Sequence, residues 1–175
     1  LARTADILSE VAELRGRSGC PRAVVGFAAE TRDVLANARE ATHHWVTRQQ
    51  VLVAGLASDR SLSRAVERLQ EPRANARVSA EAIVAIRAAL EPALRASTLQ
   101  GFWVLSPEGY PLYRWPDTLP PSLPVAMQEP FERALDGLPT LSSFATDTMR
   151  PGPVAALAPI RDAHGLPIAA LALAL

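Results

Sequence analysis

The fold is decided by Gly101-Phe-Trp-Val-Leu-Ser-Pro-Glu-Gly109, which continues as Tyr-Pro-Leu-Tyr-Arg-Trp, and by a second stretch of the same kind. The second is Val154-Ala-Ala-Leu-Ala-Pro-Ile-Arg-Asp162, which continues through Gly165 to an apolar run ending at Leu175. Each stretch has two short apolar runs around a glycine-containing turn, the pattern of a β-hairpin. We therefore expect one antiparallel sheet built from two hairpins, with the segment between them crossing a face.

The first strand of this sheet predicts how its faces are covered. Side chains alternate along a strand, so Phe102 and Val104 lie on one face and Trp103 and Leu105 on the other. Since both pairs are apolar, we expect other elements to cover both faces of the sheet.

Between the hairpins, apolar residues at helical spacing over Val125–Leu135 predict a short helix, with Gly137 as its C-cap. Leu141–Met149 predicts a further strand. The proline-rich stretch before the helix, residues 116–124, predicts an extended connection rather than an element.

The chain upstream of the hairpins reads as mainly helical. One apolar stripe is formed by Trp45, Leu52, Leu56, Leu62, Val66 and Leu69. We expect a break near Ser58–Asp59, with Asp59 or Ser61 capping the next helical piece. Arg73–Ser97 predicts another helix, kinked or restarted at Pro92. The predicted class is α+β: long N-terminal helices followed by a PAS-like antiparallel sheet of two hairpins with a short crossing helix.

Composition narrows the function classes. The 18 basic residues are all arginine and balance 18 acidic ones, so the net charge is zero, which argues against a nucleic-acid-binding surface. Without lysine, no Schiff base can form. The single cysteine, Cys20, excludes an internal disulfide. Adjacent histidines and a third in a distant turn do not predict a metal site. Because the chain begins at Leu1 without methionine, we interpret it as a fragment.

The N-terminal part carries one resemblance. Asp6-Ile-Leu8, Val25-Gly-Phe-Ala-Ala-Glu-Thr31 and Asn37-Ala-Arg39 resemble phosphopantothenoylcysteine ligase, a nucleotide-using enzyme of coenzyme A synthesis. The resemblance implies that the apolar run Ala23–Ala29 is a buried strand of a Rossmann-like sheet. It also implies CTP and magnesium as cofactors, a cytoplasmic location, and nucleotide contacts from Gly26, Phe27, Ala28, Ala29, Glu30 and Thr31.

The remainder carries another resemblance. Gly101–Gly109, Ala134-Leu-Asp-Gly137 and Ala158–Gly165, with Leu56-Ala-Ser-Asp59 upstream, resemble the Cache family of sensor domains in order and spacing over about residues 42–175. Cache domains are PAS-like and lie outside the membrane in bacterial receptors. The resemblance implies a small-molecule ligand, a carboxylate or an amine, and an extracytoplasmic location.

The candidate ligand-binding residues are of two kinds. Tyr113-Arg114-Trp115 would pair a ligand carboxylate with a guanidinium between aromatic walls. Asp162, beside Arg161, would hold an ammonium. Each has a structural alternative: an edge strand with an exposed arginine, and a turn residue bonding its own backbone. Two further candidates are Trp103 and Phe144, for which the favoured structural alternative is a place in the packed core.

These observations give two functional hypotheses over three segments. The segments are residues 1–40, residues 41–99 and residues 100–175, the last two forming one folding unit. The main hypothesis is a ligand-sensing domain of a membrane-bound receptor, joined to the membrane by helices outside this chain and dimerising through its long helix. The alternative is a partial or chimeric phosphopantothenoylcysteine ligase. A domain that only spaces or dimerises its host is a third interpretation. No catalytic residue or resident metal is predicted.

Overall fold

The computed structural model describes residues 21–72, 75–96, 99–122, 127–143 and 154–175. The chain divides into two compact units, Leu1–Trp45 and Val46–Leu175. The finer division predicted at residues 40 and 99 stays a prediction.

The described residues of the first unit are helical. Helix α2 spans Pro21–Ala57, and its proline stands at the first helical position, where the missing N–H costs no hydrogen bond. The predicted buried strand Ala23–Ala29 is therefore wrong, because these residues lie within α2. A short apolar run does not by itself distinguish a strand from a helix. Residues 21–45 contain no strand with which this run could pair.

Helix α3 spans Arg60–Gln70 and begins where the sequence predicts. Its N-cap, Asp59, has an extended backbone, and its Oδ1 accepts hydrogen bonds from the backbone N–H groups of Ser61 at 2.6 Å and Leu62 at 3.4 Å. These bonds satisfy donors that have no partner within the helix. The predicted break between α2 and α3 is confirmed.

Helix α4 spans Ala76–Ala96. Asn75 caps the start of this helix: its Oδ1 accepts a hydrogen bond of 2.9 Å from the backbone N–H of Val78. The predicted restart at Pro92 is not found, since this residue lies inside α4.

The five strands form one antiparallel sheet in the order β2-β1-β5-β4-β3. Their bounds are β1 Gly101–Leu105, β2 Pro111–Trp115, β3 Thr140–Ser143, β4 Val154–Arg161 and β5 Pro167–Ala174. Helix α5, Gln128–Leu135, lies between the two hairpins in the chain. Gly109 and Gly165 have φ values of 85° and 84° in the two turns, a conformation that glycine adopts readily. The α+β class and the sheet of two hairpins are confirmed.

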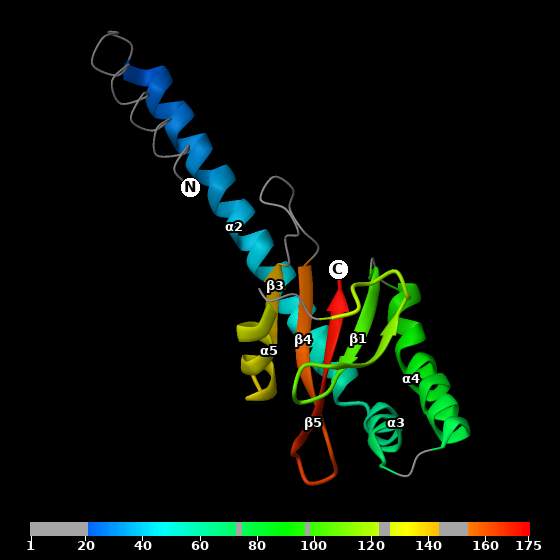
Figure 1. The fold of residues 1–175 in the computed structure, drawn as a ribbon. Coiled ribbons are helices and arrows are strands. Elements are labelled where there is room, and N and C mark those ends of the chain that lie inside the picture. The colour runs from blue at the N-terminus through cyan, green and yellow to red at the C-terminus, as the bar shows by residue number, and fades with distance from the viewer. Residues whose placement is uncertain (1–20, 73–74, 97–98, 123–126, 144–153) are drawn as a thin grey trace. The chain divides into compact units, whose positions relative to one another are not determined.

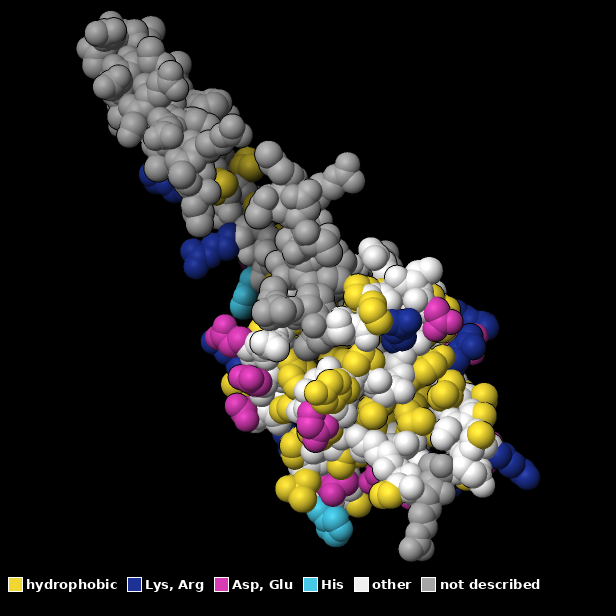
Figure 2. Space-filling model, in the orientation of Figure 1, with side chains coloured by type: hydrophobic (Ala, Val, Ile, Leu, Met, Phe, Trp, Pro, Cys, Tyr) yellow, Lys and Arg dark blue, Asp and Glu magenta, His cyan; other side chains and the backbone are white. Residues whose placement is uncertain are grey.

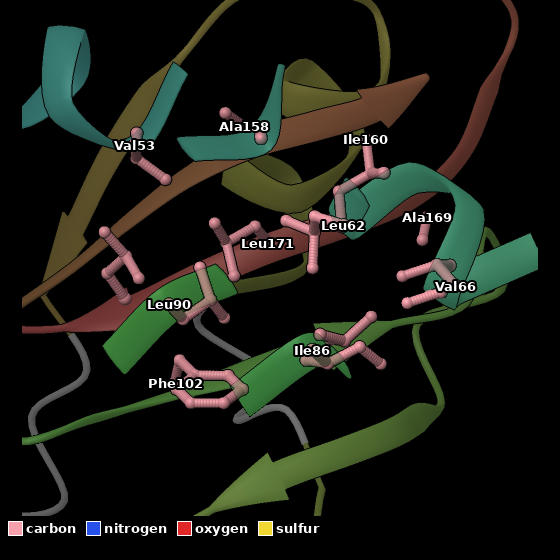
Figure 3. Close-up of a cluster of buried hydrophobic side chains, with 14 of the residues drawn as sticks. Val53, Leu62, Val66, Ile86, Leu90, Phe102, Ala158, Ile160, Ala169 and Leu171 are labelled. Atoms are coloured by element: carbon pink, nitrogen blue, oxygen red, sulfur yellow. The ribbon is translucent and has the colours of Figure 1, made fainter. Parts of the chain in front are cut away.

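Helices cover both faces of this sheet (Figure 1). On one face, Leu62 of α3 and Ile86 of α4 pack with Phe102 and Leu171 (Figure 3). The end of α2 joins this cluster through Val53. On the other face, a smaller cluster includes α5 and a set of alanines from β4 and β5. The strand β1 is fully buried, as its two apolar faces predict.

No helix in the described part of the chain is long and apolar enough to span a membrane.

We expect Leu62→Ala to destabilise the second unit by about 2–5 kcal/mol, because it leaves a cavity beneath α3. Leu62 has 0% exposure, whereas Val84 on α4 is 67% exposed. Val84→Ala is therefore the matched control, expected within about 0.5 kcal/mol of the parent. Urea unfolding followed by circular dichroism measures both. Equal effects of the two substitutions would contradict the described core.

We expect the N-cap residue Asp59 to make the free energy of unfolding depend on pH. Hydrogen bonds from the hydroxyl and then the backbone N–H of Ser61 lower the pKa of Asp59 in the folded protein. A lowered folded-state pKa gives stability that is present above the unfolded value, about 3.9, and is lost as the pH falls further. Asp59→Ala should cost about 0.5–2 kcal/mol at pH 7.

The difference between Asp59→Ala and the parent should shrink in urea unfolding at acid pH. Asp59→Asn keeps an acceptor without a titrating group and serves as the control. A difference that is constant with pH would show that the charge of Asp59 does not contribute.

Candidate functional site

The sheet separates the aromatic–arginine residues that the sequence places side by side. In the register of β1 and β2, Tyr113 lies opposite Val104 and Trp115 opposite Phe102, whereas Arg114 lies opposite Trp103. Directly opposite residues share a face, so Arg114 and its two aromatic neighbours point to different faces. The predicted clamp of a guanidinium between two aromatic walls is wrong for this reason.

A different arginine meets the aromatic side chains. The ring centroids of Phe102 and Tyr113 are 5.8 Å apart, and those of Phe102 and Trp115 are 6.3 Å apart. The Cζ atom of Arg87 on α4 lies 5.9 Å from the centroid of the Trp115 ring, within the range of a cation–π interaction. No signal in the sequence connects Arg87 to these strands, since their proximity depends on how α4 packs.

Trp103 belongs to the core on the α5 side. It has 0% exposure, and its indole N–H donates a hydrogen bond of 3.0 Å to the carbonyl oxygen of Pro120. Its neighbours in the cluster include Met127 and Phe131. The structure therefore places it among packed side chains rather than on the wall of an open site. The other aromatic candidate, Phe144, lies outside the described residues.

Arg161 and Asp162 lie together at the β4–β5 turn. The Oδ1 atom of Asp162 accepts hydrogen bonds of 2.8 Å from the backbone N–H groups of His164 and Leu166. This is the turn-residue alternative for Asp162. Arg161 donates from Nη1 to the carbonyl oxygen of Gly165 at 2.6 Å.

Acidic, basic and apolar side chains are interspersed on the face of the molecule that Figure 2 presents. A groove with a volume of about 750 Å³ nevertheless groups several arginines. It lies among the end of α2, α3, the residues before β3, and the β4–β5 turn. Its charged lining residues are Arg60, Arg64, Glu67, Arg161 and Asp162.

Sequence reasoning found only Arg161 and Asp162 of this groove. The arginine and glutamate residues of Arg60–Arg68 suggest a solvated helix face when they are read alone. Arg60 and Arg64 are four residues apart and thus neighbours on α3, which was a usable signal. Which element faces them is a property of the tertiary structure.

The nucleotide-binding candidates of the ligase resemblance all lie on α2. They are consecutive, Gly26–Thr31, and form part of a continuous helix rather than the end of a strand. Among the residues that the structure describes, no group of three histidine, cysteine or acidic side chains is arranged to hold a metal ion.

A family model described as "DNA/pantothenate metabolism flavoprotein C-terminal domain" matches residues 1–68. The match covers less than half of the 175-residue chain. No curated protein matches the chain. At the level of the family, this match relates the N-terminal segment to enzymes of coenzyme A biosynthesis.

The prediction of a Cache sensor domain of a membrane receptor is corrected by this match, which points to coenzyme A biosynthesis instead. The motifs that suggested it, such as Ala134-Leu-Asp-Gly137, are short. Their order follows from a helix, a hairpin, a short helix and a second hairpin, and this order describes the fold rather than an activity.

We expect Tyr113 to ionise above the ordinary phenol value of about 10. Burial raises the pKa of Tyr113, and Asp117 adds to this effect, while Arg87 opposes it. Since the folded state holds the phenol neutral, stability should fall as the pH rises above about 10. The chain has two tyrosines, so Tyr110→Phe isolates Tyr113 in a spectrophotometric titration.

The same variant in concentrated urea provides the unfolded reference. A midpoint in the folded protein at or below that reference would contradict the burial of Tyr113.

Proposed function

We propose that this chain is part of a coenzyme A biosynthesis protein and that its N-terminal segment serves the CTP-dependent ligation of phosphopantothenate and cysteine. The observation that carries the proposal is the family match over residues 1–68. That match includes Val25–Thr31, the run with the most specific ligase resemblance. The proposed cofactors are CTP and magnesium.

The chemistry of a nucleotide indicates which charged residues to test. Triphosphate oxygens need cationic donors or a metal ion, and arginine is the basic residue available because the chain has no lysine. Arg32 directly follows the proposed nucleotide-contact residues, and Arg39 lies seven residues further along α2. Residues seven apart lie on nearly the same side of a helix, and both are exposed.

Because Gly26–Thr31 are helical, the proposal does not include a nucleotide site at the end of a strand. A Rossmann-like sheet binds its ligand beyond the ends of its strands, and this run is part of a helix here. We therefore assign to the segment a binding role for CTP with magnesium and assign no catalytic residue.

We expect the full chain to bind CTP with magnesium in isothermal titration calorimetry. Arg32→Gln combined with Arg39→Gln should weaken binding roughly tenfold or more, since charge-assisted hydrogen bonds contribute about 1.5–3 kcal/mol each. Arg77→Gln combined with Arg95→Gln is the control with the same charge change on α4.

Calorimetry is preferable to a thermal shift, because ligand binding in one unit need not change the unfolding of the other. Absence of CTP binding at millimolar concentration, or equal binding by the parent and the Arg32/Arg39 variant, would overturn the proposal.

A further inference from the structure

The groove beside α3 brings together arginines that are far apart in the sequence. Arg60 and Arg64 come from α3, and Arg161 comes from the end of β4, about a hundred residues later. All three line one groove of about 750 Å³, a size within the range of small-molecule sites.

Among the residues that the structure describes, Arg60 and Arg64 on α3 lack the glutamate partner that three arginines of α4 and α5 have. On α4 and α5, Arg77, Arg95 and Arg133 each form an ion pair with a glutamate four residues away. On α3, the position four residues after Arg60 is held by Arg64, and neither forms an ion pair within the described part of the chain. Like charges at this spacing destabilise a helix, so an anion between them would relieve the repulsion.

Arg161 is oriented by a hydrogen bond within its own turn. Its Nη1 donates to the carbonyl oxygen of Gly165 at 2.6 Å. Gly137, with φ of 102°, lies against it, and a Cβ atom there would come within 2.7 Å of Nη2. A guanidinium that is already positioned loses less conformational entropy when it binds an oxyanion.

The groove also contains carboxylates, but they are fewer than its arginines. Oδ1 of Asp162 is engaged by two backbone N–H groups of its own turn. Three arginines and two carboxylates, Glu67 and Asp162, line the groove, so its lining carries one positive charge in excess. The hydroxyl groups of Ser58 and Ser63 on the same lining donate to the carbonyl oxygens of Ala54 and Asp59.

We infer that this groove binds a compact oxyanion, a phosphate or a carboxylate group of a small molecule, between the arginines of α3 and Arg161. The site lies in the second unit and uses none of the residues assigned to CTP. It therefore stands or fails separately from the proposed function.

The test is calorimetric titration of the full chain with inorganic phosphate and, separately, with malonate, at constant ionic strength. Arg60→Gln combined with Arg64→Gln should weaken binding at least tenfold, and so should Arg161→Gln. The control is Arg77→Gln combined with Arg95→Gln, which should leave binding unchanged. Tighter binding of phosphate assigns a phosphorylated ligand, and tighter binding of malonate assigns a carboxylate.

Because Arg161→Gln removes a hydrogen bond within the turn, Arg161→Lys is made as well. It keeps the charge but lacks the planar fork, so we expect intermediate binding. Thermal unfolding verifies that each variant is folded. The inference is overturned if neither anion binds at millimolar concentration, or if the α3 and α4 variants weaken binding equally.

Discussion

The structure of the second unit depends on the pairing of β1 with β5. These strands belong to different hairpins, and their ladder runs from Gly101 opposite Ala174 to Leu105 opposite Ala170. Without this pairing the two hairpins would be separate ribbons, and an isolated hairpin is marginally stable in water. Because the central strands are apolar on both faces, they also require cover on both sides. The end of α2, α3 and α4 supply it on one face and α5 on the other.

The same pairing determines where polar chemistry is possible. All of β1 and six of the eight residues of β5 are buried, so residues such as Trp103 belong to the core. Charged side chains gather only at the margins, and the groove of Arg60, Arg64 and Arg161 lies at one of them. The two proposals thus rest on different observations. The proposal of CTP binding rests on a family match to residues 1–68, which extends into the second unit, and the proposal of an oxyanion groove rests on a cluster of charges.

Local signals predicted most of the elements. Glycines at the turns marked both hairpins, and Asp59 marked the start of α3, since these signals act through neighbouring backbone groups. Ala23–Ala29 failed because a short apolar run fits either a strand or a helix. The separation of Arg114 from its neighbours could have been predicted, because alternation along a strand is enough. The groove could not, since Arg161 meets α3 only after the whole unit has packed.

The strand β4 is longer than its outer neighbour, and this difference has a consequence for the protein in solution. Strand β3 pairs only with Val154–Leu157, so the remaining residues of β4, Ala158–Arg161, form a free edge within the described structure. Free edges recruit strands from other molecules. Pro159 lies on this edge and has no N–H to offer, and the charge of Arg161 follows it. A proline and a charged residue on an edge strand both disfavour pairing with a strand of another molecule.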